Sequence, residues 1–252
     1  MSQWLVLTIA MAAVCGVVLT ITVLKERRIG EDDDPSETPD VIEYLTMMVG
    51  VVYAIVLGLA IAGVWEARSG AEDTVRAEAQ ALHEVSTRVQ VWPAPVRDTI
   101  RKDVESYVGY VVHKEWPVMA ERGELTQRGA DLLAKVRTDV MGYHPRDDYE
   151  RESYQPLVDQ VAAADSARTA RSDAADSTLP GVVWFGLIIG GVISIGVMYT
   201  LQIRRSGREM LMAGVFSALI AFLLFLVWDF DAPFSRGLQA AADPFLALFP
   251  HV

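Results

Sequence analysis

The hydrophobic pattern is dominated by one apolar segment that continues without a break into a charged helical segment. Residues 41–65 carry no charge after Glu43, and an apolar run of this length is enough to cross the hydrocarbon core of a bilayer. Residues 66–91 are charged but keep apolar positions at helical spacing, and no helix-stopping signal occurs before Pro93 and Pro95. The pattern predicts one long helix, half in lipid and half in water.

Three further apolar segments predict three more membrane spans. They cover residues 4–24, 181–203 and 210–228, each of roughly the length that a transmembrane helix needs. Basic residues follow the first segment, whereas a cleavable signal peptide carries its basic residues before the apolar run. We therefore expect the first segment to be a retained helix.

The segment between the second and third spans, residues 66–179, is helical by its period. Two apolar stripes stand out, one before and one after the proline corner: Val75, Ala79, Leu82, Val85 and Val89, then Val96, Ile100, Val104, Tyr107 and Val111. A shorter helix is predicted around residues 132–140, after a connection that Gly123 and Gly129 loosen. A last helix with a thin apolar stripe is predicted to begin near Pro156. No strand-like alternation occurs.

These elements predict an all-α membrane protein with four transmembrane helices and a helical soluble domain between the second and third. The chain divides into residues 1–65 with two spans, residues 66–179 as the helical domain, and residues 180–252 with the last two spans. Asp243 and Pro244 then resemble an N-cap and a first-turn proline. The apolar residues after them suggest a short helix lying in the membrane interface.

Small residues mark two faces of the predicted spans. Ala54, Gly58 and Ala62 recur at four-residue spacing in the second span, and the third holds Gly186, Gly190 and Gly191. Small side chains let another helix backbone approach closely. Packing within one chain and packing between copies explain them equally well.

Basic residues predict the orientation in the membrane. They gather in the two short links, after the first span (Lys25, Arg27, Arg28) and after the third (Arg204, Arg205, Arg208). Short basic links stay in the cytoplasm, so the middle domain and both termini are expected outside it. Trp4, Trp65, Trp184 and Trp228 would then form an aromatic belt at one interface.

Composition removes several classes of function. The chain has 252 residues, 52% of them hydrophobic, and a net charge of −11, which disfavours nucleic acid as a partner. Its single cysteine, Cys15, excludes an internal disulfide, and its four histidines have no metal-ligand spacing. Nucleotide-binding and hydrolase motifs are absent, so we expect no cofactor, no metal and no enzymatic activity.

The spans hold no charged residue in their cores, which favours a passive pore or no conduction over ion-coupled transport. Glu66, Asp229 and Asp231 are predicted at the same interface as the four tryptophans. In an oligomer they would form an acidic pore mouth that attracts cations. As isolated residues they are explained equally well as helix ends at headgroup level.

With these residues laid out, the chain resembles the bacterial bestrophin-like domain family. The resemblance covers nearly the whole chain and rests on three motifs: YAIVLGLAIAGVWE at 53–66, EWP at 115–117 and DAPFS at 231–235. It implies a bacterial plasma-membrane protein. Similarity to bestrophins themselves would imply a pentameric anion channel with four spans and a helical domain between the second and third. The acidic balance of the chain favours cations instead.

Two classes of function stay open at this stage. One is an oligomeric, channel-like protein, with the lipid bilayer, further copies of the chain and ions as its partners. The other is a non-conducting membrane protein whose helical domain binds or senses a partner.

Overall fold

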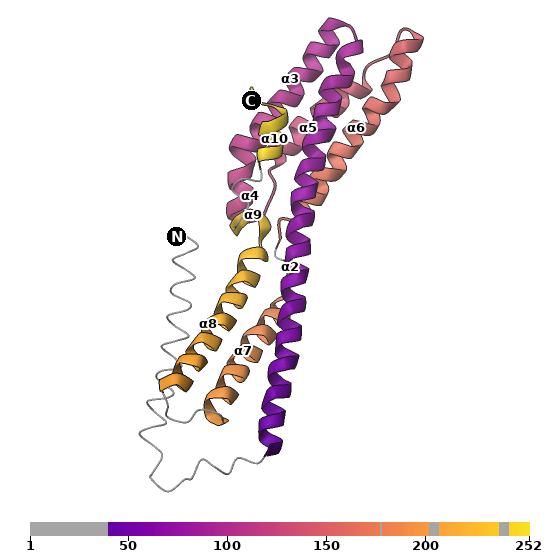
Figure 1. The fold of residues 1–252 in the computed structure, drawn as a ribbon. Helices are drawn as coiled ribbons and strands as arrows, with labels where there is room; N and C mark the ends of the chain where they lie inside the picture. Colours follow the sequence, from indigo (N-terminus) through magenta and orange to yellow (C-terminus); the bar gives the residue numbers. More distant parts are fainter. Residues whose placement is uncertain (1–39, 177, 202–206, 237–241) are drawn as a thin grey trace. The chain divides into compact units, whose positions relative to one another are not determined.

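The computed structural model describes residues 40–176, 178–201, 207–236 and 242–252. Helices joined by turns make up these residues, with no strand among them (Figure 1). They divide into two compact units. The membrane unit contains the described residues up to Trp65 together with Leu179–Asp231, and the helical unit contains Glu66–Thr178 and Ala232–Val252.

The longest element, α2, is one unbroken helix of 49 residues, Asp40–Arg88. It continues through Gly70 without a break, as the sequence predicted, because a lone glycine costs only about 1 kcal/mol relative to alanine in a helix. A short 3₁₀ turn, η2 (Val89–Val91), follows it. The chain then leaves helical geometry at Trp92, which is extended and precedes Pro93.

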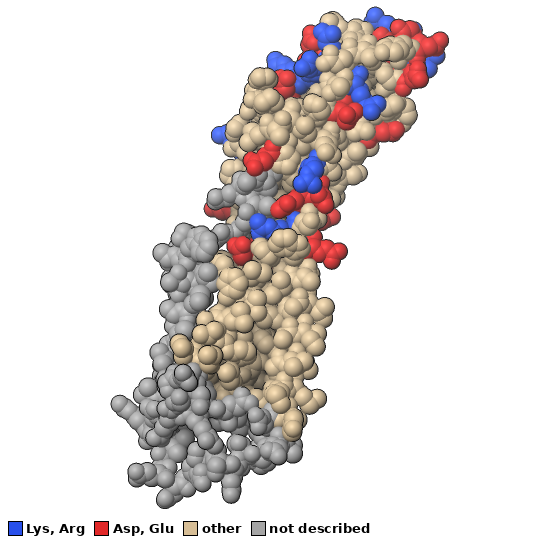
Figure 2. Space-filling model, viewed as in Figure 1, with Lys and Arg blue, Asp and Glu red and all other residues tan. Residues whose placement is uncertain are grey.

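Three described helices are long and apolar enough to cross a bilayer: α2, α7 (Gly181–Leu201) and α8 (Gly207–Phe230). They correspond to the second, third and fourth predicted spans. The first predicted span, residues 4–24, lies outside the described residues. On the face that Figure 2 shows, the charged side chains gather on the helical unit, whereas the described part of the membrane unit is almost free of them.

The core of the membrane unit joins α2 to α7 and α8. Tyr53 and Leu57 of α2 are buried with Leu187 of α7 and Ile220 of α8. The Tyr53 hydroxyl donates a hydrogen bond to the carbonyl oxygen of Leu187 at 3.1 Å. This bond holds the tyrosine ring against α7.

Two glycines of α7 make room for that ring. A Cβ atom on Gly190 would lie 2.7 Å from Tyr53 Cδ2, and one on Gly191 would lie 2.9 Å from the Tyr53 hydroxyl oxygen. Both distances are shorter than a carbon atom tolerates. The glycines therefore serve packing within one chain.

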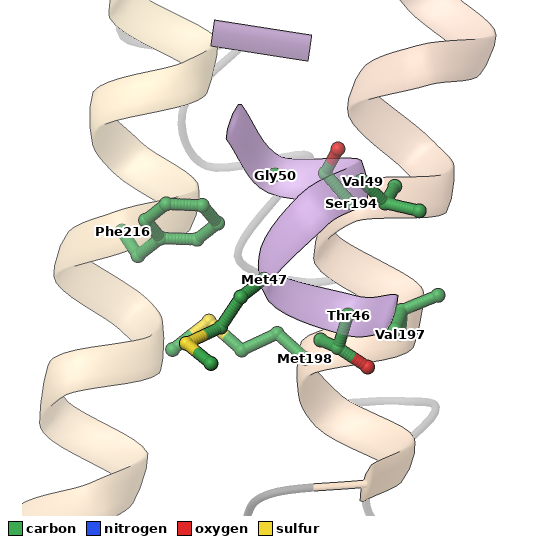
Figure 3. A pocket seen from close by; sticks show the side chains of 8 residues that line it. All are labelled: Thr46, Met47, Val49, Gly50, Ser194, Val197, Met198 and Phe216. Atoms are coloured by element: carbon green, nitrogen blue, oxygen red, sulfur yellow. The ribbon is translucent and has the colours of Figure 1, made fainter. Parts of the chain in front are cut away.

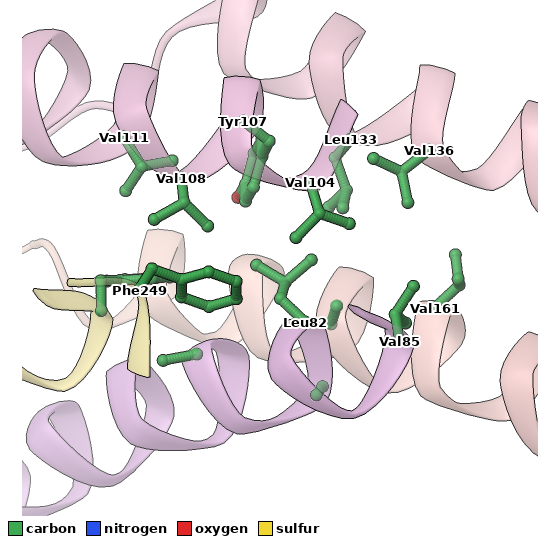
Figure 4. Close-up of a cluster of buried hydrophobic side chains, with 14 of the residues drawn as sticks. Leu82, Val85, Val104, Tyr107, Val108, Val111, Leu133, Val136, Val161 and Phe249 are labelled. Atoms are coloured by element: carbon green, nitrogen blue, oxygen red, sulfur yellow. The ribbon is translucent and has the colours of Figure 1, made fainter. Parts of the chain in front are cut away.

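The helical unit packs the second half of α2 against shorter helices. These are α3 (Ala94–Tyr110), the π-helical turn η3 (Val111–Glu115), α4 (Trp116–Arg122), α5 (Gln127–Met141) and α6 (Asp148–Asp173). Both predicted apolar stripes enter its core, with Val96 only partly buried. Figure 4 shows Leu82 and Val85 of α2 facing Val104 and Val108 of α3.

Two helix boundaries differ from the prediction. The last helix of this unit, α6, begins at Asp148 and not near Pro156, because the Asp147 side chain caps it by accepting a hydrogen bond from the Glu150 amide at 2.7 Å. Gly123 ends α4 in the left-handed conformation with φ of 70°. Gly129 lies inside α5 and does not loosen a connection.

The C-terminal segment belongs to the helical unit. Its two short helices are α9 (Pro233–Arg236) and α10 (Asp243–Leu248). The sequence predicted that the second of these would lie in the membrane interface. Instead Phe245 and Phe249 are buried in the core of the helical unit, where aromatic side chains remove the largest apolar area from water.

The glycines of α7 provide a matched test of this packing. Gly190→Ala should lower the stability of the protein by about 1–3 kcal/mol, because the added methyl group overlaps a ring that its hydroxyl hydrogen bond holds in place. Gly186→Ala has open space around its Cβ position and should be neutral or slightly stabilising. Thermal unfolding of the purified protein in detergent measures both, and equal melting temperatures would contradict this packing.

Candidate functional site

The densest group of buried polar side chains in the described residues lies in the helical unit. We call it the buried charge cluster, and its members come from α2, α3, η3 and α6: Glu78, Tyr107, Glu115, Arg168 and Arg171. All five are buried. Charged side chains are rarely fully buried unless they are paired, so the partners of each one decide what the cluster can do.

Helical periodicity places these charges inside. Glu78 lies three residues after Val75 and four before Leu82, on the same buried stripe of α2. On α6 the buried positions continue from Leu157 in steps of three and four residues, through Val161 and Ala164, and reach Arg168 and Arg171. The apolar stripe of α6 looked thin in the sequence because its continuation consists of arginines.

The arginines bind the two glutamates in paired geometry. Arg168 donates from Nη1 and Nη2 to the two carboxylate oxygens of Glu115, at 2.6 and 2.8 Å. Arg171 donates from Nε and Nη2 to Glu78, at 2.7 and 3.2 Å, and from Nη2 to Glu115 at 3.1 Å. Such two-point contacts between arginine and carboxylate are among the strongest hydrogen bonds in proteins.

Tyr107 connects the two pairs. Its hydroxyl group donates a hydrogen bond to Glu78 and accepts one from Arg168 Nη1 at 3.0 Å. The cluster holds two carboxylates and two guanidinium groups, so its formal charges balance. Arg171 also lies over the ring of Trp116, with its Cζ atom 5.8 Å from the ring centre.

Glu115 ends the π-helical turn, and Trp116 and Pro117 follow it at the start of α4. Pro117 has no amide hydrogen to donate and cannot follow regular α-helix geometry in a helix interior, which accounts for a wider turn directly before it. Single π-helical turns inside helices occur often at functional sites. Here the turn places Glu115 between Arg168 and the start of α5.

The start of α5 is built around the same carboxylate. Thr126 donates to Glu115 Oε2 from its amide at 3.0 Å and from its hydroxyl at 2.7 Å. The Thr126 hydroxyl also caps α5 by accepting from the Gly129 amide at 3.2 Å. A Cβ atom on Gly129 would lie 2.2 Å from Glu115 Oε2. Only glycine leaves room for the carboxylate at this position.

Electrostatics shifts the pKa values of several members of the cluster away from their usual values. Burial alone would raise the pKa of Glu115, but Arg168 and Arg171 outweigh it and lower this pKa to about 2. Burial, and then the neighbouring Glu78, raises the pKa of Tyr107 well above its usual value. Burial opposes the charge of Arg171, yet the adjacent carboxylates raise its pKa as well.

Both carboxylates of the cluster are fully engaged in hydrogen bonds. Each carboxylate oxygen of Glu78 and Glu115 already accepts at least one hydrogen bond. No group of three or more metal-binding side chains occurs in the part of the chain that the structure describes. The hydrogen bonds and ion pairs of the cluster join α2, α3, η3, α5 and α6 and hold them in one arrangement.

The predicted pore-mouth residues have three different environments. Asp231 is buried, and its carboxylate accepts from the Leu179 amide at 2.7 Å and from Trp184 Nε1 at 3.0 Å. It joins the end of α8 to the start of α7. Asp229 is half-buried in α8, whereas Glu66 is exposed in α2. The sequence treated the three as equivalent, but the structure gives Asp231 a structural role.

The predicted helix-packing residues also separate into two groups. Gly190 and Gly191 contact Tyr53, as described above. The others are exposed on the membrane unit: Ala54, Gly58, Ala62 and Gly186. Open space surrounds the Cβ positions of the two glycines among them.

Comparison with known proteins gives the family. The model of the bestrophin-like domain matches residues 12–245, which is nearly the whole chain. The chain belongs to the bestrophin-like family. The motif EWP that suggested this family contains Glu115 of the buried charge cluster, and DAPFS contains Asp231.

A solved structure supports the same fold. It is a crystal structure of a membrane protein that covers 98% of this chain and 98% of its own, with a TM-score of 0.61 and 12% sequence identity. At this identity the likeness concerns the fold alone. Among curated proteins, none matches the chain.

Substitutions in the buried charge cluster test whether its ion pairs stabilise the helical unit. Arg171→Met removes one partner of two buried carboxylates and should cost about 3–5 kcal/mol of stability. Adding Glu78→Leu removes one of those orphaned charges, so the double variant should be less destabilised than the sum of the single changes. Denaturant unfolding of the full chain in detergent measures both.

Lys135 is the matched control for this experiment. It is exposed and pairs with Asp103 and Asp139, so Lys135→Met should cost at most about 1 kcal/mol. If Arg171→Met lowered the stability no more than Lys135→Met does, the cluster would not be what holds the helical unit together.

Proposed function

We propose that this bestrophin-like protein assembles with further copies of itself into a membrane oligomer that conducts ions passively. The observation that carries the proposal is the small-residue face of α2. Ala54, Gly58 and Ala62 are exposed, and they lie beside the face that Tyr53 and Leu57 bury against α7 and α8.

A lipid-facing helix surface has no need of small residues, and most other exposed side chains in the apolar part of α2 are bulky. Its large exposed side chains include Leu45, Met48, Val52, Ile55 and Leu59. Small residues instead allow two helix backbones to approach closely, which brings many van der Waals contacts and replaces lipid. This supports a second copy of the chain as the occupant of the face.

The composition of the spans supports passive conduction. Within 44–65, 181–199 and 211–228, the described parts of α2, α7 and α8 that are apolar enough to span, no charged residue occurs. Transport coupled to protons or ions usually relies on ionisable groups at that depth. The saturated hydrogen bonds of the buried charge cluster support a role without catalysis.

Carboxylates at the ends of the spans support a preference for cations. Glu66 follows the apolar part of α2 directly, and Asp229 lies in the last turn of α8. A carboxylate near a wall of low dielectric constant raises the local concentration of cations. Asp231 is left out because its oxygens accept hydrogen bonds from Leu179 and Trp184.

The basic residues of the short links support an orientation in the bacterial plasma membrane with the helical unit outside the cytoplasm.

The first test concerns assembly. Gly58→Leu places a large side chain on the small-residue face and should convert the oligomer into smaller species without lowering the melting temperature. Gly63→Leu is the control, because Gly63 also lies in α2 with open space around its Cβ position but outside that face. Native mass spectrometry in detergent measures the copy number. A monomeric wild-type protein would refute the proposal.

The second test concerns conduction. Reversal potentials in planar bilayers under a salt gradient should indicate cation selectivity, and Glu66→Gln or Asp229→Asn should move the potential toward zero. Glu105→Gln, which removes an exposed carboxylate in the middle of α3, should leave it unchanged. Silent bilayers with a well-folded oligomer would favour the non-conducting class. Anion selectivity that both variants leave unchanged would refute the acidic mouth.

A further inference from the structure

The membrane unit contains a pocket of about 220 Å³ that its packing leaves unfilled. It lies between α2, α7 and α8, and its lining consists of Thr46, Met47, Val49, Gly50, Ser194, Val197, Met198 and Phe216. Figure 3 shows the side chains of Met47 and Met198 extending toward α8, from which Phe216 points back. Every lining residue belongs to a helix of the membrane unit.

The lining suits an apolar chain better than water or an ion. Only Thr46 and Ser194 among the eight lining residues carry a polar side chain, and both are neutral hydroxyls. A buried water typically needs two to four polar partners, and an apolar cavity of about 150 Å³ stays dry and binds a ligand as large as benzene. The thioethers of Met47 and Met198 are flexible and adapt to ligands of irregular shape.

Ser194 adds one specific requirement. The residue is only 6% exposed, and its hydroxyl oxygen has no hydrogen-bond partner among the described residues. Ser217, a buried serine in the same unit, does satisfy its hydroxyl by donating to the carbonyl oxygen of Ala213 at 2.8 Å. A buried hydroxyl left without a partner costs about 1–3 kcal/mol, so a ligand with a hydrogen-bond acceptor would be favoured here.

The surrounding membrane supplies a ligand that has both an apolar chain and a hydrogen-bond acceptor. Large apolar side chains of the same three helices are exposed, among them Met48, Ile193 and Met212, so the unit is covered by lipid in a membrane. Thr46 lies two residues after Tyr44, where the apolar part of α2 begins, and Ser194 lies five residues before Tyr199, where that of α7 ends. The pocket therefore lies toward one end of the spans, and lipid ester groups lie at the ends of the hydrocarbon core. We infer that this pocket binds an acyl chain of a membrane glycerolipid, with Ser194 donating a hydrogen bond to its ester carbonyl oxygen.

Gly50 makes the inference testable without disturbing the fold. It lines the pocket, and a Cβ atom there would meet nothing within 4 Å, so Gly50→Leu should fill the pocket and also favour the helix. Gly63→Leu adds the same side chain to α2 away from the pocket and is the matched control. Thermal unfolding of both variants in detergent verifies that they fold.

The experiment uses the full chain in phosphatidylcholine vesicles that contain a trace of a phospholipid with a diazirine in its acyl chain. After irradiation, mass spectrometry of peptides should find labels at Met47, Met198 or Phe216 in the wild type. Gly50→Leu should lower this labelling by about tenfold, equivalent to about 1.4 kcal/mol of binding, whereas Gly63→Leu should not change it. Equal labelling in all three proteins would mean random contact with surrounding lipid and would overturn the inference.

Ser194→Ala tests the hydrogen bond by itself. It should reduce labelling by the ester-linked probe while leaving that by an ether-linked analogue unchanged, because only the ester carries the carbonyl acceptor. Equal labelling by both probes in the variant and the wild type would overturn the role of Ser194. None of these results depends on whether the protein conducts ions.

Discussion

The pairing of two glutamates with two arginines inside the helical unit is the constraint on which the rest of that unit depends. Removing four charges from water costs several kcal/mol for each ion, and only full pairing with good geometry offsets this cost. Glu78, Glu115, Arg168 and Arg171 reach that state because α2, η3 and α6 converge on one point. A shift of any of these helices by one turn would leave a buried charge without its partner.

The membrane unit is under a different constraint, because the lipid hydrocarbon provides no partner for a charged side chain. Its described helices therefore rely on close contact, with Tyr53 resting on Gly190 and Gly191, and with charges kept to the ends of the spans. Asp231 is such an end residue, and it accepts hydrogen bonds from the Leu179 amide and the Trp184 side chain that hold the turn before α7. The exposed small face of α2 is then the feature that packing among the described residues does not explain.

The sequence was enough to predict most of the longer described helices, because apolar periodicity is a local property. It predicted the unbroken α2, the second, third and fourth apolar helices, and the stripes with Leu82 and Val104. It missed the buried charge cluster, since pairing Glu78 with Arg171 joins residues 93 positions apart. The available signal was local all the same: Arg168 and Arg171 continue the buried stripe of α6, where a solvated charge would break the period.

The family motifs take on a different meaning once they are placed in the structure. Glu115 of EWP organises the buried charge cluster, and Trp116 meets Phe234 of DAPFS edge to face, with ring centres 5.8 Å apart. Both motifs thus contribute to the folding of the chain. Residues that are engaged in folding in this way are less available to bind an ion or a ligand, so surfaces that folding leaves open are the better candidates for function. In the described chain these include the small face around Gly58 and the pocket around Ser194.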